Sequence, residues 1–358
     1  MSNFAKLRFI LLPLQLFYAF VIWLRNVLYD KNILKSYTPK IPSICVGNIA
    51  VGGTGKTPMV EYLIDLLKDN YHIIVISRGY KRKTKGLVVA NSNSTAQEIG
   101  DEAMQYWSKF QEIDVIVDAD RTRAVKYVET NNYPSLRQPV IIFDDAFQHR
   151  KIKAGLNMVL TDYAKPYYKD CLLPVGNLRD EKKSAKRTDI VIVTKSPKNI
   201  SVREKKSIIE KLNPKNEKNI YFSHIEEQKI KTFEGRNVNF NTKPLEQVHL
   251  FLLTGIHNNH HLIEHLLSFK FQISSFEFPD HHDYTKSDMK MLQSAVDKVK
   301  LPNKYLITTE KDFMRLKNSP YLEFLKNVTL CYLPMKTAFS ESDKILINNK
   351  IQEYVRKT

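Results

Sequence analysis

Eight consecutive residues near the start of the chain have the pattern of a phosphate-binding loop. They are Ala50, Val51, Gly52, Gly53, Thr54, Gly55, Lys56 and Thr57. In such a loop, glycines let backbone N–H groups turn toward phosphate oxygens, and the lysine neutralises the terminal phosphates. The threonine hydroxyl is the group that ligates Mg²⁺. The spacing therefore predicts a site for a nucleoside triphosphate and magnesium.

The residues on either side of this loop provide the context that such a site requires. Residues 41–46 predict a buried strand, and residues 58–68 predict an amphipathic helix that starts at Pro58. The N-terminus of that helix would direct the positive end of its dipole at the phosphates. Ala50 departs from the usual G-x-x-x-x-G-K-[ST] pattern by replacing its first glycine. A purely structural glycine turn is the alternative interpretation.

A later apolar run ends in two carboxylates. Residues 140–143 (Val-Ile-Ile-Phe) predict a strand, and Asp144 and Asp145 follow it directly. A strand that delivers an aspartate beside the phosphate loop is what magnesium coordination in a P-loop enzyme needs. A strand ending in Asp is also common at turns. Its combination with the loop favours the metal role.

Another carboxylate pair, Asp101 and Glu102, follows Gly100 where a loop is expected to enter a helix. An Asp at a helix start can cap the backbone N–H groups. The same loop should lie at the carboxyl edge of the sheet, where ligands bind. A base there could accept a hydroxyl proton during phosphoryl transfer. These residues alone leave capping and catalysis equally open.

Histidines form two groups in the last third of the chain. His281 and His282 stand between two aspartates and could orient or tune a catalytic carboxylate. The other group could suggest zinc, but it lacks cysteines and the H-E-x-x-H pattern, so a zinc site is disfavoured. Its members are His257, His260, His261 and His265.

Composition limits the class of protein. The 358 residues include 55 basic and 38 acidic side chains, a formal net charge of +17, which favours an anionic partner. The basic residues are scattered and accompany no nucleic-acid-binding signature, so no nucleic-acid partner is expected. Three widely spaced cysteines indicate a reducing compartment without disulfides. No obligate protein partner is inferred.

The N-terminus suggests which anion is involved. Residues 9–24 are almost entirely apolar, and Arg8 and Arg25 flank them. As a helix this run spans about 24 Å at 1.5 Å per residue, less than the roughly 30 Å hydrocarbon core of a bilayer. A peripheral anchor on an anionic membrane surface is favoured over a short membrane span or an ordinary buried helix.

The remaining pattern predicts the fold class. Short apolar runs alternate with helical segments, as in parallel βαβ units, so we expect a P-loop NTPase-type, doubly wound, mostly parallel sheet. A second, smaller α/β domain should follow. The expected boundaries are 1–30 for a membrane-associated helix, 31–225 for the nucleotide-binding domain and 226–358 for the smaller domain. Further strands are expected at 71–76, 114–117, 156–161, 190–193, 220–231, 247–253, 271–278, 305–308 and 328–333, and a last helix at 344–354.

An ordered series of motifs resembles one known family. They are residues 46–48, 52–58, 77–80 (Ser-Arg-Gly-Tyr), 100–102, 120–121, 144–149 (Asp-Asp-Ala-Phe-Gln-His), 173–180 (Leu-Pro-Val-Gly-Asn-Leu-Arg-Asp), 278–281 and 309–312 (Thr-Glu-Lys-Asp). Together they resemble the tetraacyldisaccharide 4′-kinases, enzymes of lipid A biosynthesis in Gram-negative bacteria. The resemblance covers roughly residues 41–315.

That resemblance implies an activity and a location. The expected reaction is ATP-dependent phosphorylation, with Mg²⁺, of the 4′-hydroxyl of a tetraacylated glucosamine disaccharide 1-phosphate. The expected architecture is a two-lobed kinase whose smaller domain closes over the active site. The expected location is the cytoplasmic face of the bacterial inner membrane, with peripheral or monotopic attachment through the N-terminal helix.

The resemblance also implies residue roles. Asp101 is similar to the family's catalytic base, with His281 as its partner. Asp144, Asp145 and Asp180 resemble the magnesium-site carboxylates. Further active-site candidates are Gln148, Arg179, Arg78 and Arg121. The chain departs from the family pattern at two positions: Ala146 stands where Gly is usual, and Asp180 stands where Glu is usual.

Two rival functions belong to other classes. A GTP-hydrolysing switch needs an Asn/Thr-Lys-x-Asp motif after a strand, and residues 194–197 begin that motif but end in Pro. A structural membrane-surface protein with a vestigial loop is the other rival. The intact Lys56, Thr57 and Asp145 count against it.

Overall fold

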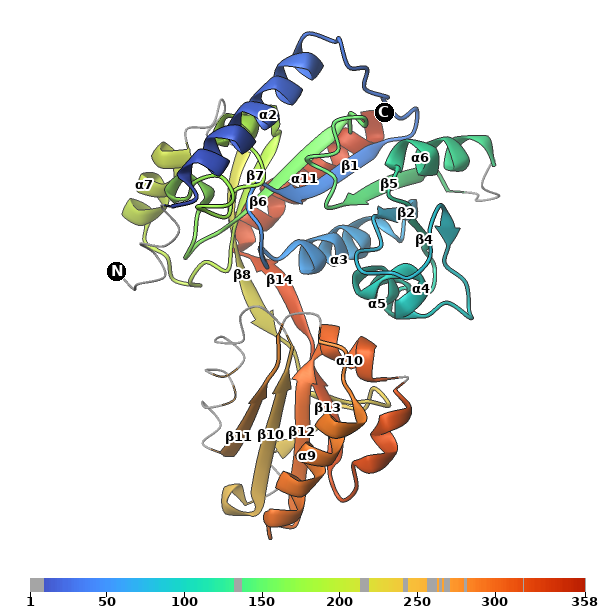
Figure 1. Ribbon diagram of the computed structural model, residues 1–358, viewed down its shortest axis with the longest axis vertical. Coiled ribbons are helices and arrows are strands. Elements are labelled where there is room, and N and C mark those ends of the chain that lie inside the picture. The colour runs from blue at the N-terminus through green and yellow to red at the C-terminus, as the bar shows by residue number, and fades with distance from the viewer. Residues whose placement is uncertain are drawn as a thin grey trace. The chain divides into compact units, whose positions relative to one another are not determined.

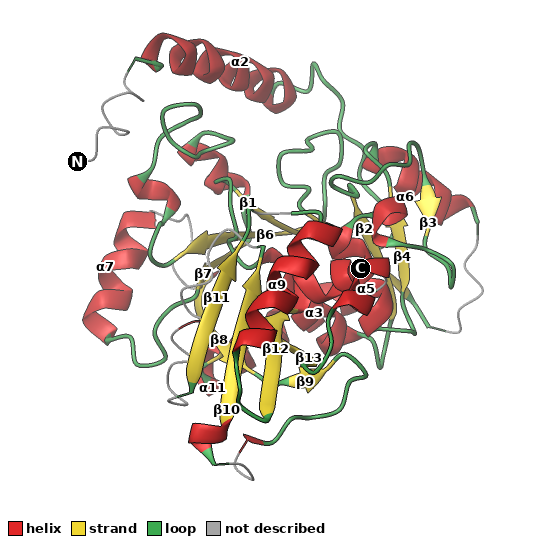
Figure 2. Ribbon diagram, turned by 60° about the horizontal axis from the view of Figure 1, so that its bottom comes forward, coloured by secondary structure: helices red, strands yellow, loops and turns green. Residues whose placement is uncertain are grey.

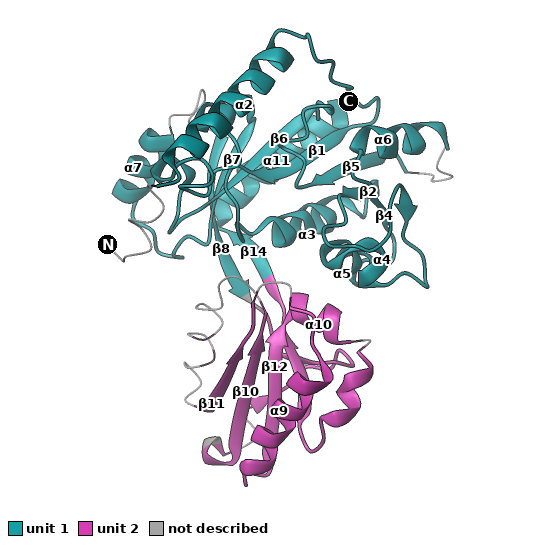
Figure 3. Ribbon diagram, in the orientation of Figure 1, with its two compact units in different colours: residues 1–226, 336–358 teal, residues 227–335 magenta. Residues whose placement is uncertain are grey.

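The computed structural model describes most of the chain and groups it into two compact units (Figures 1 and 3). The residues described are 10–131, 137–212, 219–240, 244–255, 263, 266, 271–279, 282–317 and 319–357. Unit 1 comprises residues 1–226 and 336–358, and unit 2 comprises residues 227–335.

Unit 1 is an α/β unit that alternates strands with helices, as the sequence predicts. Its strands are β1 (Ser43–Asn48), β2 (His72–Ser77), β3 (Val88–Val89), β4 (Asp114–Val117), β5 (Pro139–Asp144), β6 (Leu156–Asp162), β7 (Ile190–Thr194), β8 (Ile220–Glu227) and β14 (Met335–Phe339). Its helices are α2 (Leu12–Asp30), α3 (Lys56–Leu67), α4 (Ala96–Ile99), α5 (Asp101–Lys109), α6 (Arg121–Thr130), η1 (Tyr167–Lys169), η2 (Lys182–Arg187), α7 (Val202–Leu212) and α11 (Glu341–Lys357).

The strands of unit 1 form one mostly parallel sheet. Within the described residues its order is β14-β8-β7-β6-β1-β5-β2-β4-β3. Strand β1 lies between β5 and β6 and pairs with both in parallel. All six residues of β1 are buried, as expected for a central parallel strand covered on both faces. The loop after β1 therefore starts from the middle of the sheet, at its carboxyl edge.

Alternate residues of the strands pack into two cores, one on each face of the sheet. Ile44 and Val46 join a core built with helices α3, α5 and α11, whereas Cys45 joins a core built with α6 and α7. This alternation follows from the two-residue period of a strand. Burial on both faces makes β1 a rigid support for the loop that follows it.

Unit 2 holds a second, smaller sheet. Its strands are β9 (Lys231–Thr232), β10 (Val248–Thr254), β11 (Gln272–Glu277), β12 (Asn303–Thr309) and β13 (Thr329–Leu333), in the order β11-β10-β12-β13-β9. Its helices are η5 (Leu245–Gln247), α9 (Lys286–Lys298), α10 (Glu310–Leu316) and η6 (Pro320–Phe324). Helix α9 runs alongside β10 and β12 (Figure 2), where Met289 and Leu292 pack against Phe251 and Leu306.

The C-terminal end of the chain differs from the predicted smaller domain over 226–358. Strand β14 joins the edge of the larger sheet, and α11 buries Ile347, Ile351 and Val355 in the core of unit 1. The Tyr354 hydroxyl also donates to the Ser43 carbonyl at 3.1 Å, next to the start of β1. The last strand and helix therefore belong to the larger unit (Figure 3).

Helix α2 is the described helix that is long and apolar enough to cross a membrane, judged by length and composition. Most of its apolar side chains are exposed, including Leu16 at 68 % and Phe17 at 69 %. Ile22 and Asn26 are its buried residues. Within the described chain, α2 is therefore not an ordinary core helix.

Candidate active site

The predicted phosphate loop lies between β1 and α3. Gly52 has a φ of +113° and Gly55, the N-cap residue of α3, has a φ of +82°, conformations that favour glycine. A Cβ on Gly53 would meet no described atom within 4 Å, so the backbone there faces open space. Helix α3 begins at Lys56, two residues before the predicted start at Pro58. The loop and helix N-terminus have the form that binds phosphate.

Buried polar contacts hold the loop in shape. The Asn48 Nδ2 donates to the Thr54 Oγ1 at 2.9 Å, and Gln148 donates to the Asn48 carbonyl at 2.5 Å. From the end of β7, the Thr194 hydroxyl donates to the Thr54 carbonyl at 2.9 Å. The Lys195 Nζ donates to the Gly53 carbonyl and pairs with Asp162 at 2.9 Å. These contacts satisfy the Gly53 and Thr54 carbonyls and fix the Thr54 side chain.

Asp145 lies beside the loop and is surrounded by cations. Its backbone N–H donates to the Val46 carbonyl at 2.9 Å, and its φ is +50°. Its Oδ2 lies 3.7 Å from the Lys56 Nζ. The Arg179 guanidinium binds both carboxylate oxygens, at 3.1 and 2.8 Å, and also donates to the Asn48 side chain. The structure thus brings together Lys56, Asp145 and Arg179, as predicted for one site.

The two neighbouring aspartates have opposite pKa shifts. Burial raises the pKa of Asp144 to about 7, and the Asp145 and Glu102 charges add to this effect. Burial would also raise the pKa of Asp145, but Lys56 and Arg179 outweigh it and lower that pKa to about 2. Asp145 is therefore anionic at neutral pH, while Asp144 readily exchanges its proton. The Ser77 hydroxyl donates to the Asp144 Oδ2 at 3.3 Å.

The predicted arginines occupy different environments. Arg121 is buried, and its Nη2 donates to the Asp145 carbonyl at 3.1 Å. Burial lowers its pKa, although the two aspartates act in the opposite direction. Arg78 is exposed, on the loop after β2. Both lie near His149, whose pKa burial lowers to about 4, so that this imidazole is neutral at pH 7.

Asp101 is the first residue of α5, and Gly100 is the N-cap residue. Gly100 has a φ of +92°, and a Cβ on it would lie 3.1 Å from the Gly79 backbone. This close approach joins the loop after β2 to the start of α5. Glu102 is near enough to Asp144 to raise its pKa. Glu102 therefore lies in the same region as Asp144, the last residue of β5.

Asp180 has a different environment from Asp144 and Asp145. Its side chain is fully buried, and Arg187 donates to its Oδ2 at 2.9 Å. The Asn26 side chain, from α2, donates to its Oδ1 at 2.9 Å. Among the residues that the structure describes, no three His, Cys, Asp or Glu side chains are grouped as a ready-made metal site. The magnesium role of Asp180 stays a prediction, and its observed contacts are structural.

The histidine predictions fall mainly outside the described residues. His281 and the group at 257, 260, 261 and 265 lie there. His282 is described, and its Nε2 lies 2.9 Å from the Asp288 Oδ2 while its ring stacks on Phe278. Asp288 also forms a capping box with Thr285 at the start of α9. The described contacts of His282 are therefore those of a residue that stabilises a helix start.

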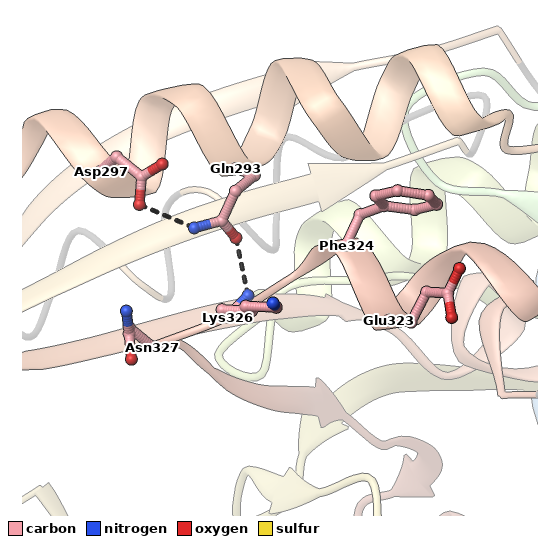
Figure 4. Close-up of a pocket in the computed structure, with 6 residues that line it drawn as sticks. All are labelled: Gln293, Asp297, Glu323, Phe324, Lys326 and Asn327. Carbon is pink, nitrogen blue, oxygen red and sulfur yellow. Dashed lines mark hydrogen bonds between the residues drawn. The ribbon is translucent and has the colours of Figure 1, made fainter.

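A surface cavity of about 720 Å³ also lies in unit 2 (Figure 4). Its lining is mixed polar and apolar, and Gln293 bridges Asp297 and the Lys326 backbone at 2.7 Å each. None of the predicted site residues lines it. Its lining residues are Gln293, Asp297, Glu323, Phe324, Lys326 and Asn327.

The side chains around the loop fit Mg²⁺ and a triphosphate. Magnesium is usually held by one or two carboxylates together with phosphates and water, so a complete protein cage is not required. Asp144, Asp145 and the Thr57 hydroxyl are donors of that kind. Lys56, with its charge balanced by Asp145, is suited to anionic phosphate oxygens. This donor set indicates phosphoryl transfer.

Comparison with known proteins identifies the family. The family model for tetraacyldisaccharide-1-phosphate 4′-kinase, LpxK, matches residues 7–352. The chain belongs to the LpxK family. Tetraacyldisaccharide 4′-kinase of Phocaeicola vulgatus is 38 % identical over 99 % of this chain and 97 % of its own. That of Flavobacterium johnsoniae is 40 % identical over 93 % of each chain.

A solved LpxK structure has the same fold. The crystal structure of LpxK from Aquifex aeolicus in complex with ATP has a TM-score of 0.72 and 29 % identity, covering 96 % of this chain and 99 % of that one. The LpxK resemblance, the α/β fold and membership in a family of kinases are therefore confirmed.

Several residues that hold the predicted phosphate loop in shape were not singled out from the sequence. Asn48 was noted only within a motif, and Thr194 and Lys195 only as part of an incomplete GTP-binding motif. Asn48 lies at the carboxyl end of β1, Thr194 and Lys195 lie at the carboxyl end of β7, and strand β6 separates β1 from β7 in the sheet. Their position after apolar strands is the signal that could have indicated them.

Proposed function

We propose that this protein transfers the γ-phosphoryl group of ATP to the 4′-hydroxyl of a tetraacylated glucosamine disaccharide 1-phosphate in lipid A biosynthesis. Membership in the LpxK family and the names of its relatives support this substrate. The observation that carries the proposal is the arrangement of Lys56, Asp145 and Arg179 beside an open glycine loop. ATP as donor is supported by the nucleotide in the related crystal structure.

Nucleotide binding begins with the loop. Backbone N–H groups of the loop and of the N-terminus of α3 donate hydrogen bonds to phosphate oxygens, and the Lys56 ammonium neutralises the terminal phosphates. Thr57, Asp144 and Asp145 would hold Mg²⁺, which when bound screens the negative charge of the triphosphate. Arg179 keeps Asp145 ionised and oriented for this role. Arg121 does the same from the backbone side of Asp145.

Asp101 is proposed as the general base, with His281 setting its proton affinity. Its carboxylate accepts the proton of the sugar 4′-hydroxyl as that oxygen attacks the γ-phosphorus. The new oxygen–phosphorus bond forms while the bond from the γ-phosphorus to the bridging oxygen breaks, and ADP leaves. Aligning these atoms and neutralising their charge supply most of the rate enhancement. Arg78 and Gln148 line the same region as the loop and are kept as active-site candidates.

A lipid acceptor explains the features of α2. Its exposed apolar side chains suit the interface of a bilayer, and the net charge of +17 suits anionic headgroups. We therefore place the protein on the cytoplasmic face of the bacterial inner membrane, where ATP is available. Unit 2 is proposed as the smaller lobe that supplies His281 and closes over the site.

The direct test is to incubate the purified protein with Mg-ATP and the tetraacyl disaccharide 1-phosphate in detergent micelles. Mass spectrometry should detect a product with one added phosphate, and fragmentation should locate it on the distal sugar. A matched reaction with Lys56→Ala controls for contaminating kinases. An unmodified acceptor, with the wild-type protein folded and binding ATP, would reject the proposed function.

A further inference from the structure

Helix α2 has a buried side, which carries two polar residues, and a separate exposed apolar side. Tyr18, Ile22 and Asn26 follow one another at four-residue spacing and so lie on one side of the helix. Ile22 is 6 % exposed and Asn26 is 4 % exposed, in contrast to Phe17 and Phe20 at 69 % and 55 %. A buried amide in an otherwise apolar helix needs hydrogen-bond partners. The hydrogen-bond partners of Tyr18 and Asn26 show which segment of the chain this side of α2 contacts.

Three hydrogen bonds connect this side of α2 to three consecutive residues, 179–181. The Tyr18 hydroxyl donates to the Arg179 carbonyl at 3.0 Å. The Asn26 Nδ2 donates to the Asp180 Oδ1 at 2.9 Å and to the Glu181 carboxylate at 3.3 Å. We call residues 177–181 the bridging segment. It is bound to α2 through a carbonyl and two carboxylates.

The opposite side of the bridging segment is bound to the phosphate loop. The Arg179 N–H donates to the Ile49 carbonyl at 2.8 Å, and the Val51 N–H donates to the Asn177 carbonyl at 2.7 Å. These bonds pair the segment with the first residues of the loop. The Arg179 side chain then reaches Asp145 with two hydrogen bonds. The bridging segment therefore lies between α2 and the site.

The charge of Asp180 makes the connection to α2 specific. The carboxylate is fully buried, and besides Asn26 it contacts Arg187 at 2.9 Å and Arg25 at 3.9 Å. A buried carboxylate is stable only while its partners are in place. Loss of the Asn26 amide would leave one oxygen of Asp180 with fewer donors, and the segment would shift to compensate. Such a shift acts directly on Arg179, the residue that precedes Asp180 in the chain.

We propose that Tyr18, Asn26 and Asp180 are positioning residues that hold the bridging segment, and through it Arg179, against the phosphate loop. The way α2 is seated then controls nucleotide binding, in addition to any attachment of α2 to a membrane. The Asp180 carboxylate holds the bridging segment in place by accepting hydrogen bonds from Asn26 and Arg187. This inference rests on the proposed function, because it assigns the bridging segment to a nucleotide site.

The first test measures binding of Mg-ATP to the full-length protein in detergent micelles without a lipid acceptor. Tyr18→Phe should weaken binding about twofold to fivefold, and Tyr18→Phe combined with Asn26→Leu about tenfold or more. Phe17→Ser is the matched control on the opposite face of α2. It should reduce partitioning into anionic phospholipid vesicles and leave the Kd for Mg-ATP unchanged. Unaltered nucleotide affinity in the double variant would overturn the proposal.

Exchanging the residues at positions 26 and 180 tests whether Asp180 positions the segment or binds the metal. Asn26→Asp alone places two carboxylates together and should weaken Mg-ATP binding about tenfold. Adding Asp180→Asn restores an amide–carboxylate pair with the charge moved to position 26, and most of the affinity should return. If Asp180 were a direct magnesium ligand, this exchange would not restore binding, and the proposal would fail. Because binding is measured without acceptor, absence of phosphoryl transfer would reject the proposed function and not this inference.

Discussion

The Arg179 guanidinium binds the Asp145 carboxylate with two parallel hydrogen bonds, Nη1 to Oδ2 at 3.1 Å and Nη2 to Oδ1 at 2.8 Å. A planar donor pair of this kind fixes the orientation of the carboxylate as well as its charge. Arg179→Lys keeps the charge but loses the second bond. We expect turnover to fall about tenfold to a hundredfold, with a smaller change in the KM for ATP. Steady-state kinetics would test this, and wild-type turnover would show that the bidentate contact is dispensable.

Lys56 is the ammonium group nearest to Asp145 in the loop. Lys56→Ala should reduce turnover by about 10²–10³-fold, because the charge developing on the phosphates loses its closest counterion. A neighbouring exposed residue, Val51→Ala, is the matched control and should retain activity within about twofold. Comparable turnover in Lys56→Ala and wild type would exclude the P-loop assignment.

Asp101→Asn should separate binding from chemistry. The amide keeps the shape of the side chain but cannot accept a proton, so turnover should fall about 10²–10⁴-fold while the Kd for Mg-ATP stays near wild type. Glu102→Gln serves as the control for charge at the start of α5. If both variants lose activity equally, the base assignment of Asp101 is not specific.

Lys195 connects β7 to the loop through the Gly53 carbonyl. Lys195→Met removes that hydrogen bond and leaves Asp162 without its cation. The KM for ATP should rise about fivefold to tenfold, with less effect on turnover, because loop shape acts on binding. The double variant with Asp162→Asn should be less impaired than Lys195→Met. An unchanged KM would show that the loop holds its conformation without this contact.

His149 predicts how stability depends on pH. Its pKa in the folded protein is about 4, below its ordinary value of 6.5, because burial and Arg121 disfavour the charged form. Between these values the unfolded chain binds a proton that the folded chain does not, so stability falls as the pH decreases. This contribution is complete above pH 6.5 and is lost as the pH falls through about 4.

His149→Gln removes this titration. The fall in Tm between pH 7.5 and pH 4.5 should be smaller in the variant than in the wild type, by about 2–4 °C for each kcal/mol. Thermal unfolding followed by circular dichroism at both pH values would measure it. Parallel pH profiles for the two proteins would contradict the assigned pKa.

Exposed apolar residues of α2 should control membrane binding. Leu16→Ser with Phe20→Ser removes two side chains that are 68 % and 55 % exposed. Each apolar side chain buried in a membrane contributes about 1.5–3 kcal/mol, so partitioning into anionic vesicles should fall at least about tenfold. Sedimentation with vesicles measures this, and the same serine pair in a buffer of high ionic strength separates apolar from electrostatic attraction. Undiminished sedimentation would place the membrane contact elsewhere.

The sequence was sufficient to predict the central strands of the larger sheet. The central strands have continuous apolar runs, and the predicted 140–143 and 114–117 correspond to β5 (Pro139–Asp144) and β4 (Asp114–Val117). Lys56 and Asp145 were predicted for one site from the loop and strand patterns, and Arg179 was added through the resemblance to a family; the structure brings the three together. Spacing alone would not have added Arg179, because it is 34 residues from Asp145 in the chain.

Contacts between distant segments were not predictable from local pattern. The buried Asp180 carboxylate accepts a hydrogen bond from Asn26, which is 154 residues away in the sequence. Asn26 lies in a helix whose sequence is mostly apolar. The return of the C-terminus to unit 1 depends on Ile347, Ile351 and Val355 packing against strands from the first half of the chain. Hydrophobic periodicity predicts that these residues are buried, but not which sheet covers them.

The placement of β14 and α11 has a consequence for synthesis of the chain. Residues 227–335 make up a complete compact unit once they are translated, whereas the larger sheet still lacks its edge strand β14 and the covering helix α11 at that stage. The nucleotide-binding unit is therefore the last part to be completed, although it contains the first residues translated. A nascent protein released before residue 335 would expose the apolar face of β1 and its neighbours and become a substrate for chaperones and proteases.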